Sequence, residues 1–152
     1  RKDRGSMKTL SAREYLGQLQ EFDININQEI ERLENMKLNA CGTSGIDYSS
    51  ERVQTSSSGD GLSRQVTNYV SLNEKINNRI DLYTDAREKI IEQIRGLHNN
   101  YFNQILFKVY VQYKSVRQAA EEMHRSYNYT VELHNKALTA FEETYKNLTY
   151  LI

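Results

Sequence analysis

Apolar residues recur at alternating spacings of four and three along two separate stretches of the chain. This spacing places one apolar stripe on each of two helices and is typical of coiled-coil helices. The stripe in residues 11–37 consists of Ala12, Leu16, Leu19, Ile26, Ile30 and Leu33, with Asp23 and Lys37 in its polar positions. The stripe in residues 62–97 consists of Leu62, Val66, Tyr69, Ile76, Ile80, Tyr83, Ile90, Ile94 and Leu97, with Asn73 and Arg87 in its polar positions.

Local signals indicate where these two helices begin and end. Ser11, followed three residues later by Glu14, forms a capping box that predicts the start of the first helix. Gly96 lies where a glycine commonly ends a helix, so it predicts the end of the second. Residues 38–61 are rich in Gly, Ser and Thr and show neither period, so we expect a mobile loop with a turn at 59–61.

Two amphipathic helices joined by a loop should fold against each other as an antiparallel hairpin. Polar residues in the stripes tend to fix the register, and Asp23 could face Arg87 or Asn73. The sequence does not set the offset between the helices. A second copy of the chain would cover the same stripes, so pairing within one chain and homodimerisation both stay open.

The composition changes after Gly96. Residues 98–100 predict a turn, and residues 101–113 are dense in aromatic and β-branched side chains. A strand here would have no partner among helices, so we predict a helix. Its buried face would contain Phe102, Ile105, Leu106, Val109 and Tyr110.

Two further helices separated by a three-residue turn are predicted after this segment. Ser115 and Gln118 form a second capping box, and the helix that they start can extend only to about Met123. Ser126 is a good N-cap for the next helix, which can extend to about Asn147. A short helix, a tight turn and a longer helix are the outline of a helix-turn-helix module. The small residues Ala119 and Ala120 would let the two helices cross closely. The second helix would have a buried face that consists of Val131, Leu133, Ala137, Leu138 and Phe141.

These elements predict an all-α protein with two parts. A long helical hairpin occupies residues 11–97, and a small helix-turn-helix domain occupies residues 98–152. Residues 1–10 are expected to be a tag remnant and an N-terminal tail, because Gly5-Ser6 before Met7 is a common cloning scar.

Composition narrows the classes of function only slightly. Lys and Arg number 20, as do Asp and Glu, so net charge neither favours nor excludes a nucleic-acid partner. Residues 98–152 hold six Lys and Arg against five Asp and Glu, a low excess for a module that binds phosphates. No apolar run approaches the ~18 residues of a membrane span, so no membrane contact is expected. Cys41 is the single cysteine, which fits a reducing cytoplasm.

The predicted helix-turn-helix resembles region four of the sigma-70 factors. That region carries a pattern close to E-I-A-x-x-L-G-[IV]-S, followed by an apolar residue and an Arg-Ala pair. This chain has Gln118 to Ser126 at the nine positions, Thr130 at the apolar position, and Lys136-Ala137 at the pair. From Ser11 to Phe141 the chain is similar to small prophage regulators related to ArpU. The similarity comprises "AREYL", "VQTSSSGD", the long Ile-rich helix and the ending from Tyr129 to Leu138.

The resemblance implies sequence-specific binding of promoter or operator DNA by a regulator of phage or prophage late genes in the bacterial cytoplasm. It implies no catalysis, cofactor or metal. The hairpin would dimerise or touch RNA polymerase. Asn128 could pair with adenine and Glu132 with cytosine. The residues expected in the major groove are Tyr127, Asn128, Tyr129, Glu132, Asn135 and Lys136, and those expected on the backbone are Lys114, Ser115, Arg117 and Arg125.

The chain departs from this pattern at several positions. Arginine is expected near the start of the recognition helix, where this chain has Asn128, Tyr129 and Glu132. Arg125 and Thr130 replace apolar residues. The alternative function is therefore a non-enzymatic helical adaptor or structural phage protein, whose degenerate helix-turn-helix binds proteins. The remaining candidate ligands, His98, His124, His134 and Cys41, share no metal-binding spacing, and His134 should lie in the core.

Overall fold

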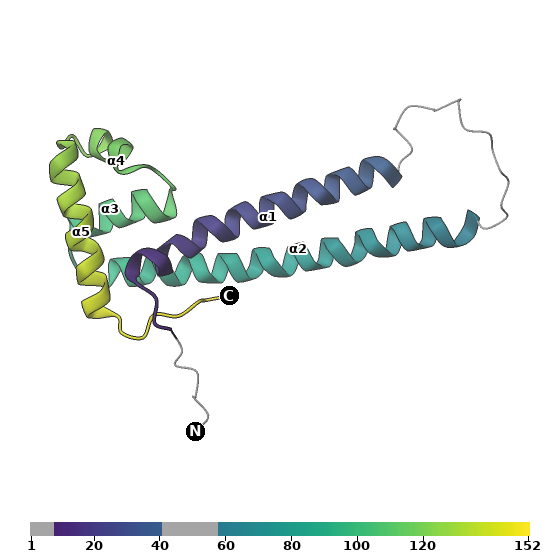
Figure 1. The fold of residues 1–152 in the computed structure, drawn as a ribbon, viewed down its shortest axis with the longest axis horizontal. Coiled ribbons are helices and arrows are strands. Elements are labelled where there is room, and N and C mark those ends of the chain that lie inside the picture. Colours follow the sequence, from purple (N-terminus) through teal and green to yellow (C-terminus); the bar gives the residue numbers. More distant parts are fainter. Residues whose placement is uncertain (1–7, 41–57) are drawn as a thin grey trace, which may run out of the picture. The chain divides into compact units, whose positions relative to one another are not determined.

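The computed structural model describes residues 8–40 and 58–152, and all regular secondary structure in these ranges is helical (Figure 1). The predicted all-α fold class is confirmed. The elements are α1 (Ala12–Ala40), α2 (Ser58–Arg95), α3 (Asn100–Leu106), the π-helical turn η1 (Phe107–Val111), α4 (Val116–Glu122) and α5 (Tyr127–Thr144). None of the described helices is both long and apolar enough to cross a membrane.

The two long helices extend into the segment that the sequence predicts as a loop. Residues 38–40 belong to α1, and residues 58–61 form the first turn of α2 instead of a turn between elements. Extending an existing helix costs far less than starting one, and no proline interrupts either end. Residues 41–57 of the predicted loop, and residues 1–7 of the predicted tag remnant and tail, lie outside the described residues.

The described chain forms two compact units. The first joins residues up to Asp23 to residues 82–152, and the second comprises residues 24–81. The first unit therefore crosses the boundary predicted at residues 97 and 98, because the base of the hairpin and the C-terminal helices share one core. That core consists of Leu10, Ala12, Tyr15, Leu16, Leu19, Ala86, Ile90, Ile91, Ile94, Ile105, Leu106, Tyr110, Val111, Ala119, Leu133, Ala137, Leu138, Phe141 and Leu148.

Within the first unit, the start of α1 is bonded to the segment around the end of α5. Ser11 and Glu14 make the predicted capping box, with N···O distances of 3.2 and 3.0 Å. The Glu142 carboxylate accepts a further bond from the backbone N–H of Ala12, at 2.8 Å. The backbone N–H of Leu10 donates to the carbonyl of Leu148, also at 2.8 Å. Leu10 is therefore a core residue, although the sequence places it in the N-terminal tail.

Helix α2 ends next to Gly96, but the role of this glycine differs from the prediction. Gly96 follows the last helical residue, but the positive φ that ends the turn belongs to His98, at 53°. The hydroxyl of Tyr145 lies so close to Gly96 that a Cβ there would overlap it. Gly96 is thus required by a close approach and not by backbone conformation.

In the second unit, the described parts of α1 and α2 run antiparallel and bury few side chains (Figure 1). Ile26 and Ile76 of the predicted stripes are buried there, and Glu29 pairs with Arg79 at 3.8 Å. The prediction is wrong at Val66 and Ile80, which remain 53% and 38% exposed, and Leu72 is buried although it lies outside the stripe. One neighbouring helix covers only part of a wide apolar face, and the offset between the helices decides which part.

Candidate nucleic-acid interface

Side-chain caps fix both helices of the predicted helix-turn-helix. The Ser115 hydroxyl accepts a hydrogen bond from the backbone N–H of Gln118 at 3.2 Å, and the Gln118 amide oxygen accepts from the N–H of Ser115 at 3.0 Å. The Ser126 hydroxyl accepts from the N–H of Tyr129 at 3.2 Å. Each cap satisfies N–H groups that have no partner inside the helix. The predicted starts of α4 and α5 are therefore confirmed.

The turn between α4 and α5 has the geometry of a Schellman motif. The N–H of Arg125 donates to the carbonyl of Ala120 at 3.0 Å, and the N–H of His124 donates to that of Glu121 at 3.2 Å. His124 has a φ of 54°, the left-handed conformation that glycine adopts most easily. His124 stands where the sigma-like pattern has its glycine, so the turn keeps the conformation although the residue differs.

Small side chains allow α4 and α5 to cross closely. Ala119 and Ala120 of α4 are buried, as predicted. Thr130 of α5 is fully buried in the position where the pattern has an apolar residue. Its hydroxyl donates to the carbonyl of Ser126 at 2.8 Å, so the polar atom is satisfied inside the helix. The departure at Thr130 is therefore compatible with the packing.

His134 belongs to the core, as the sequence predicts. Its side chain hydrogen-bonds the Tyr110 hydroxyl through Nε2 at 2.9 Å, and the two rings stack with centroids 5.6 Å apart. Burial, with a smaller contribution from the charge of Arg13, lowers the pKa of His134. The neutral imidazole is a structural group that links α5 to η1. In the described part of the chain, no three His, Cys, Asp or Glu side chains lie together as metal ligands.

Two cation–π contacts involve predicted DNA-binding side chains around the exposed start of α5. The Arg117 guanidinium lies over the ring of Tyr127, 4.9 Å from its centroid. Arg125 lies 5.4 Å from the ring centroid of Tyr129. The two contacts lie on different sides of the first turn of α5, because residues two apart on a helix do not face each other. We call the exposed surface around this turn the Arg–Tyr face, and its members are Arg117, Arg125, Tyr127, Asn128, Tyr129 and Glu132, all exposed.

The other predicted residues are placed differently. Asn135 and Lys136 are exposed farther along α5, where they line a shallow groove with Phe102. Ser115 caps α4. Lys114 is only half-exposed, and its ammonium group pairs with the Glu122 carboxylate at 2.5 Å. None of these four residues takes part in the two arginine–tyrosine contacts.

Two residues outside the predicted set interact with members of it, one directly and one through a shared carboxylate. Tyr101, in the first turn of α3, lies beneath Arg125 with its ring centroid 5.9 Å from the guanidinium, so Arg125 contacts two tyrosine rings. Lys108, in η1, shares Glu122 with Lys114. Neither position carries a local sequence signal, because both contacts depend on how α3 and η1 pack near the helix-turn-helix.

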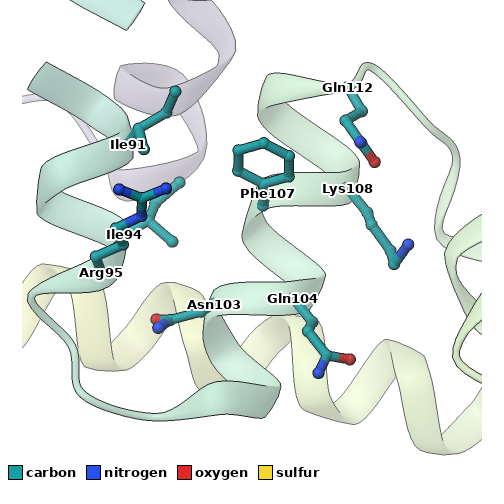
Figure 2. Close-up of a pocket in the computed structure, with 8 residues that line it drawn as sticks. All are labelled: Ile91, Ile94, Arg95, Asn103, Gln104, Phe107, Lys108 and Gln112. Carbon is teal, nitrogen blue, oxygen red and sulfur yellow. The ribbon is translucent and has the colours of Figure 1, made fainter. Parts of the chain in front are cut away.

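A groove of about 370 Å³ lies between the last turns of α2 and the α3–η1 segment (Figure 2). Ile91, Ile94 and Arg95 line it from α2, and Phe107 and Lys108 line it from η1. Its lining contains no acidic side chain and no Ser, Thr, Cys or His.

No family model, curated protein or solved structure matches this chain. The functional interpretation therefore depends on the helix-turn-helix geometry and on the chemistry of the Arg–Tyr face.

Proposed function

We propose that the chain is a sequence-specific DNA-binding transcription regulator in which α4 and α5 form the helix-turn-helix. The observation that carries this proposal is the Arg–Tyr face. Two guanidinium groups lie against tyrosine rings around the exposed first turn of α5, and an amide and a carboxylate, those of Asn128 and Glu132, are exposed on the same helix. Guanidinium groups suit phosphates, whereas amide and carboxylate groups can read base edges.

The positions of Asn128 and Glu132 define how α5 would read DNA. The two residues are four apart on one helix, so their side chains point from the same face into the major groove. Asn128 would bond N6 and N7 of adenine, and Glu132 would accept from N4 of cytosine. The operator should therefore contain both an adenine and a cytosine within the half-site that α5 contacts.

Arg117 and Arg125 would contact the backbone on the two sides of the start of α5. Their contacts with tyrosine rings limit the orientations of each guanidinium before DNA arrives. A restrained side chain loses less entropy on binding than a free one. Residues 98–152 have a net charge of only plus one, from six basic and five acidic residues, so one copy should bind weakly. A second copy, paired through α1 and α2, or a contact with RNA polymerase would supply the remaining affinity.

Selection from a random duplex library, followed by titration of the selected and a scrambled duplex at about 50 and 200 mM salt, tests the proposal. We expect the selected duplex to bind at least tenfold more tightly. The double variant Arg117→Ala/Arg125→Ala should weaken both duplexes similarly and reduce the salt slope by about 0.9 per lost phosphate contact. The charge-matched control Arg32→Ala/Arg95→Ala should leave the slope unchanged. Equal affinity for both duplexes would refute sequence-specific binding.

Phage or prophage late genes are the proposed targets, in the cytoplasm of a bacterial host. The alternative function, a protein-binding adaptor, is favoured by one specific observation. Tyr101, Tyr127 and Tyr129 remain 41–48% exposed beside two arginines, and Tyr and Arg are enriched in the energetic centres of protein interfaces. In that case Arg117→Ala/Arg125→Ala would abolish a protein complex while no duplex is preferred over another.

A further inference from the structure

Glu122 holds two lysines that come from different parts of the chain. One carboxylate oxygen lies 2.5 Å from Nζ of Lys114, and the other lies 3.1 Å from Nζ of Lys108. Hydrogen bonds from Lys114 and then Lys108 lower the pKa of Glu122, so the carboxylate is charged near neutral pH. Two ammonium groups bound to two oxygens of one anion form the arrangement that a phosphate group would also satisfy.

The backbone brings the two lysines together without any contribution from Glu122. The π-helical turn η1 ends with a bond from the N–H of Gln112 to the carbonyl of Phe107, at 3.0 Å. The N–H of Lys114 then donates to the carbonyl of Lys108, at 2.9 Å. Tyr113, between them, has a φ of 58° that reverses the chain. The lysine pair is therefore a consequence of the turn.

This turn is anchored to both long helices inside the first unit. The hydroxyl of Tyr113 is 2.5 Å from that of Tyr83 on α2 and donates to the carbonyl of Leu19 on α1, at 3.4 Å. Burial raises the pKa of Tyr113, so its hydroxyl stays protonated. Loss of the Glu122 carboxylate would consequently leave the two lysine backbones in place.

Glu122 is poorly situated for its own helix. It is the last residue of α4, and a negative charge at a helix C-terminus is unfavourable. Its side chain is 40% exposed, and those of Lys108 and Lys114 are 23% and 31% exposed, so water and ions reach the cluster. Ion pairs with this exposure contribute little to stability. A polyanion could therefore displace the carboxylate at small cost.

We propose that Lys108 and Lys114 form a phosphate-binding site that Glu122 occupies in the free protein and that a DNA backbone phosphate takes over. The assignment rests on the proposed function for its ligand. Lys114 directly precedes Ser115, the cap of α4, where backbone contacts are expected in such modules. Glu122 binds two of the six basic residues in 98–152, which lowers the charge that DNA meets.

Comparison of Glu122→Gln with Glu121→Gln tests the site. Both variants remove one negative charge from α4, but only Glu122 binds the lysines, so Glu121 is the matched control. With a non-specific duplex at ~0.15 M salt, Glu122→Gln should bind about two- to fivefold more tightly than the control, because phosphate no longer has to displace a carboxylate from the lysines. The salt slopes of the two variants should be similar, because both lysines contact phosphate in either complex. Equal affinities in the two variants would overturn the proposal.

Two further measurements test the site even if Glu122→Gln does not fold. Changing Lys108 and Lys114 to Gln in the otherwise native chain should reduce the salt slope, and an unchanged slope would contradict the site. Inorganic phosphate, compared with chloride at equal ionic strength, separates the two sources of the ligand. Binding of inorganic phosphate without a gain in DNA affinity would overturn the assignment to the DNA backbone. Because the duplex is non-specific, these results are independent of whether the chain prefers one sequence.

Discussion

Gly96→Ala is the substitution that best tests how α2 is joined to the helix-turn-helix. The added methyl group would overlap the Tyr145 hydroxyl and would lie 3.3 Å from the carbonyl oxygen of Gln93. Tyr145 cannot withdraw freely, because its hydroxyl donates to the carbonyl of Gln93 at 2.8 Å. Its ring also packs on Phe141 with centroids 4.9 Å apart.

The expected cost follows from these contacts. Overpacking a fitted site costs about 1–3 kcal/mol. Replacing glycine by alanine recovers about 0.4–1 kcal/mol by restricting the unfolded chain. We therefore expect Gly96→Ala to lower the free energy of unfolding by about 1–2 kcal/mol. Tyr145→Phe removes the hydroxyl and should cost about 0.5–1.5 kcal/mol through the lost hydrogen bond.

The double variant separates this explanation from others. Once Tyr145 is phenylalanine, the methyl group at position 96 meets no hydroxyl, so Gly96→Ala should become neutral or slightly stabilising. Urea unfolding of the four proteins, followed by circular dichroism, gives the coupling free energy. If Gly96→Ala costs the same in both backgrounds, the close approach of Tyr145 is not the reason for the glycine.

Three other predictions concern the core, the turn and the Arg–Tyr face. Burial lowers the pKa of His134 below its usual value of 6.5, so the unfolded chain binds this proton at a higher pH than the folded chain does. The free energy of unfolding should therefore decrease as the pH falls below that value, by at most ~1.4 kcal/mol per pH unit. Chemical unfolding at several pH values should show a weaker dependence of this free energy on pH for His134→Gln. His124→Gly should raise the free energy of unfolding by about 0.5–1 kcal/mol by relieving the left-handed conformation, and a lower melting temperature would contradict this. Tyr101→Leu should weaken DNA binding about two- to fivefold through Arg125, since an exposed cation–π contact is worth ~0.5–1 kcal/mol. Tyr101→Phe should bind normally, and the effect of Tyr101→Leu should vanish in Arg125→Ala, whereas a persisting effect would indicate a direct contact of Tyr101.

The candidate interface was only partly predictable from the sequence. The start of α5 and its exposed Asn128 and Glu132 follow from the cap at Ser126 and from helical periodicity. The pairing of Lys114 with Glu122 does not follow from any local pattern. Lys114 lies before α4 and Glu122 at its end, so their contact depends on the path of the preceding turn. A phosphate therefore reaches Lys114 only by displacing the Glu122 carboxylate.

The same distinction applies to the fold. The sequence by itself determined the helical class and the starts of α1, α4 and α5, because the capping bonds of Ser11, Ser115 and Ser126 join residues only three apart. The tertiary structure decided which parts of the apolar stripes are buried and why Gly96 is needed. It also joined the base of the hairpin and the helix-turn-helix in one core. These outcomes depend on the offset between helices distant in the chain, and a periodic stripe is compatible with many offsets.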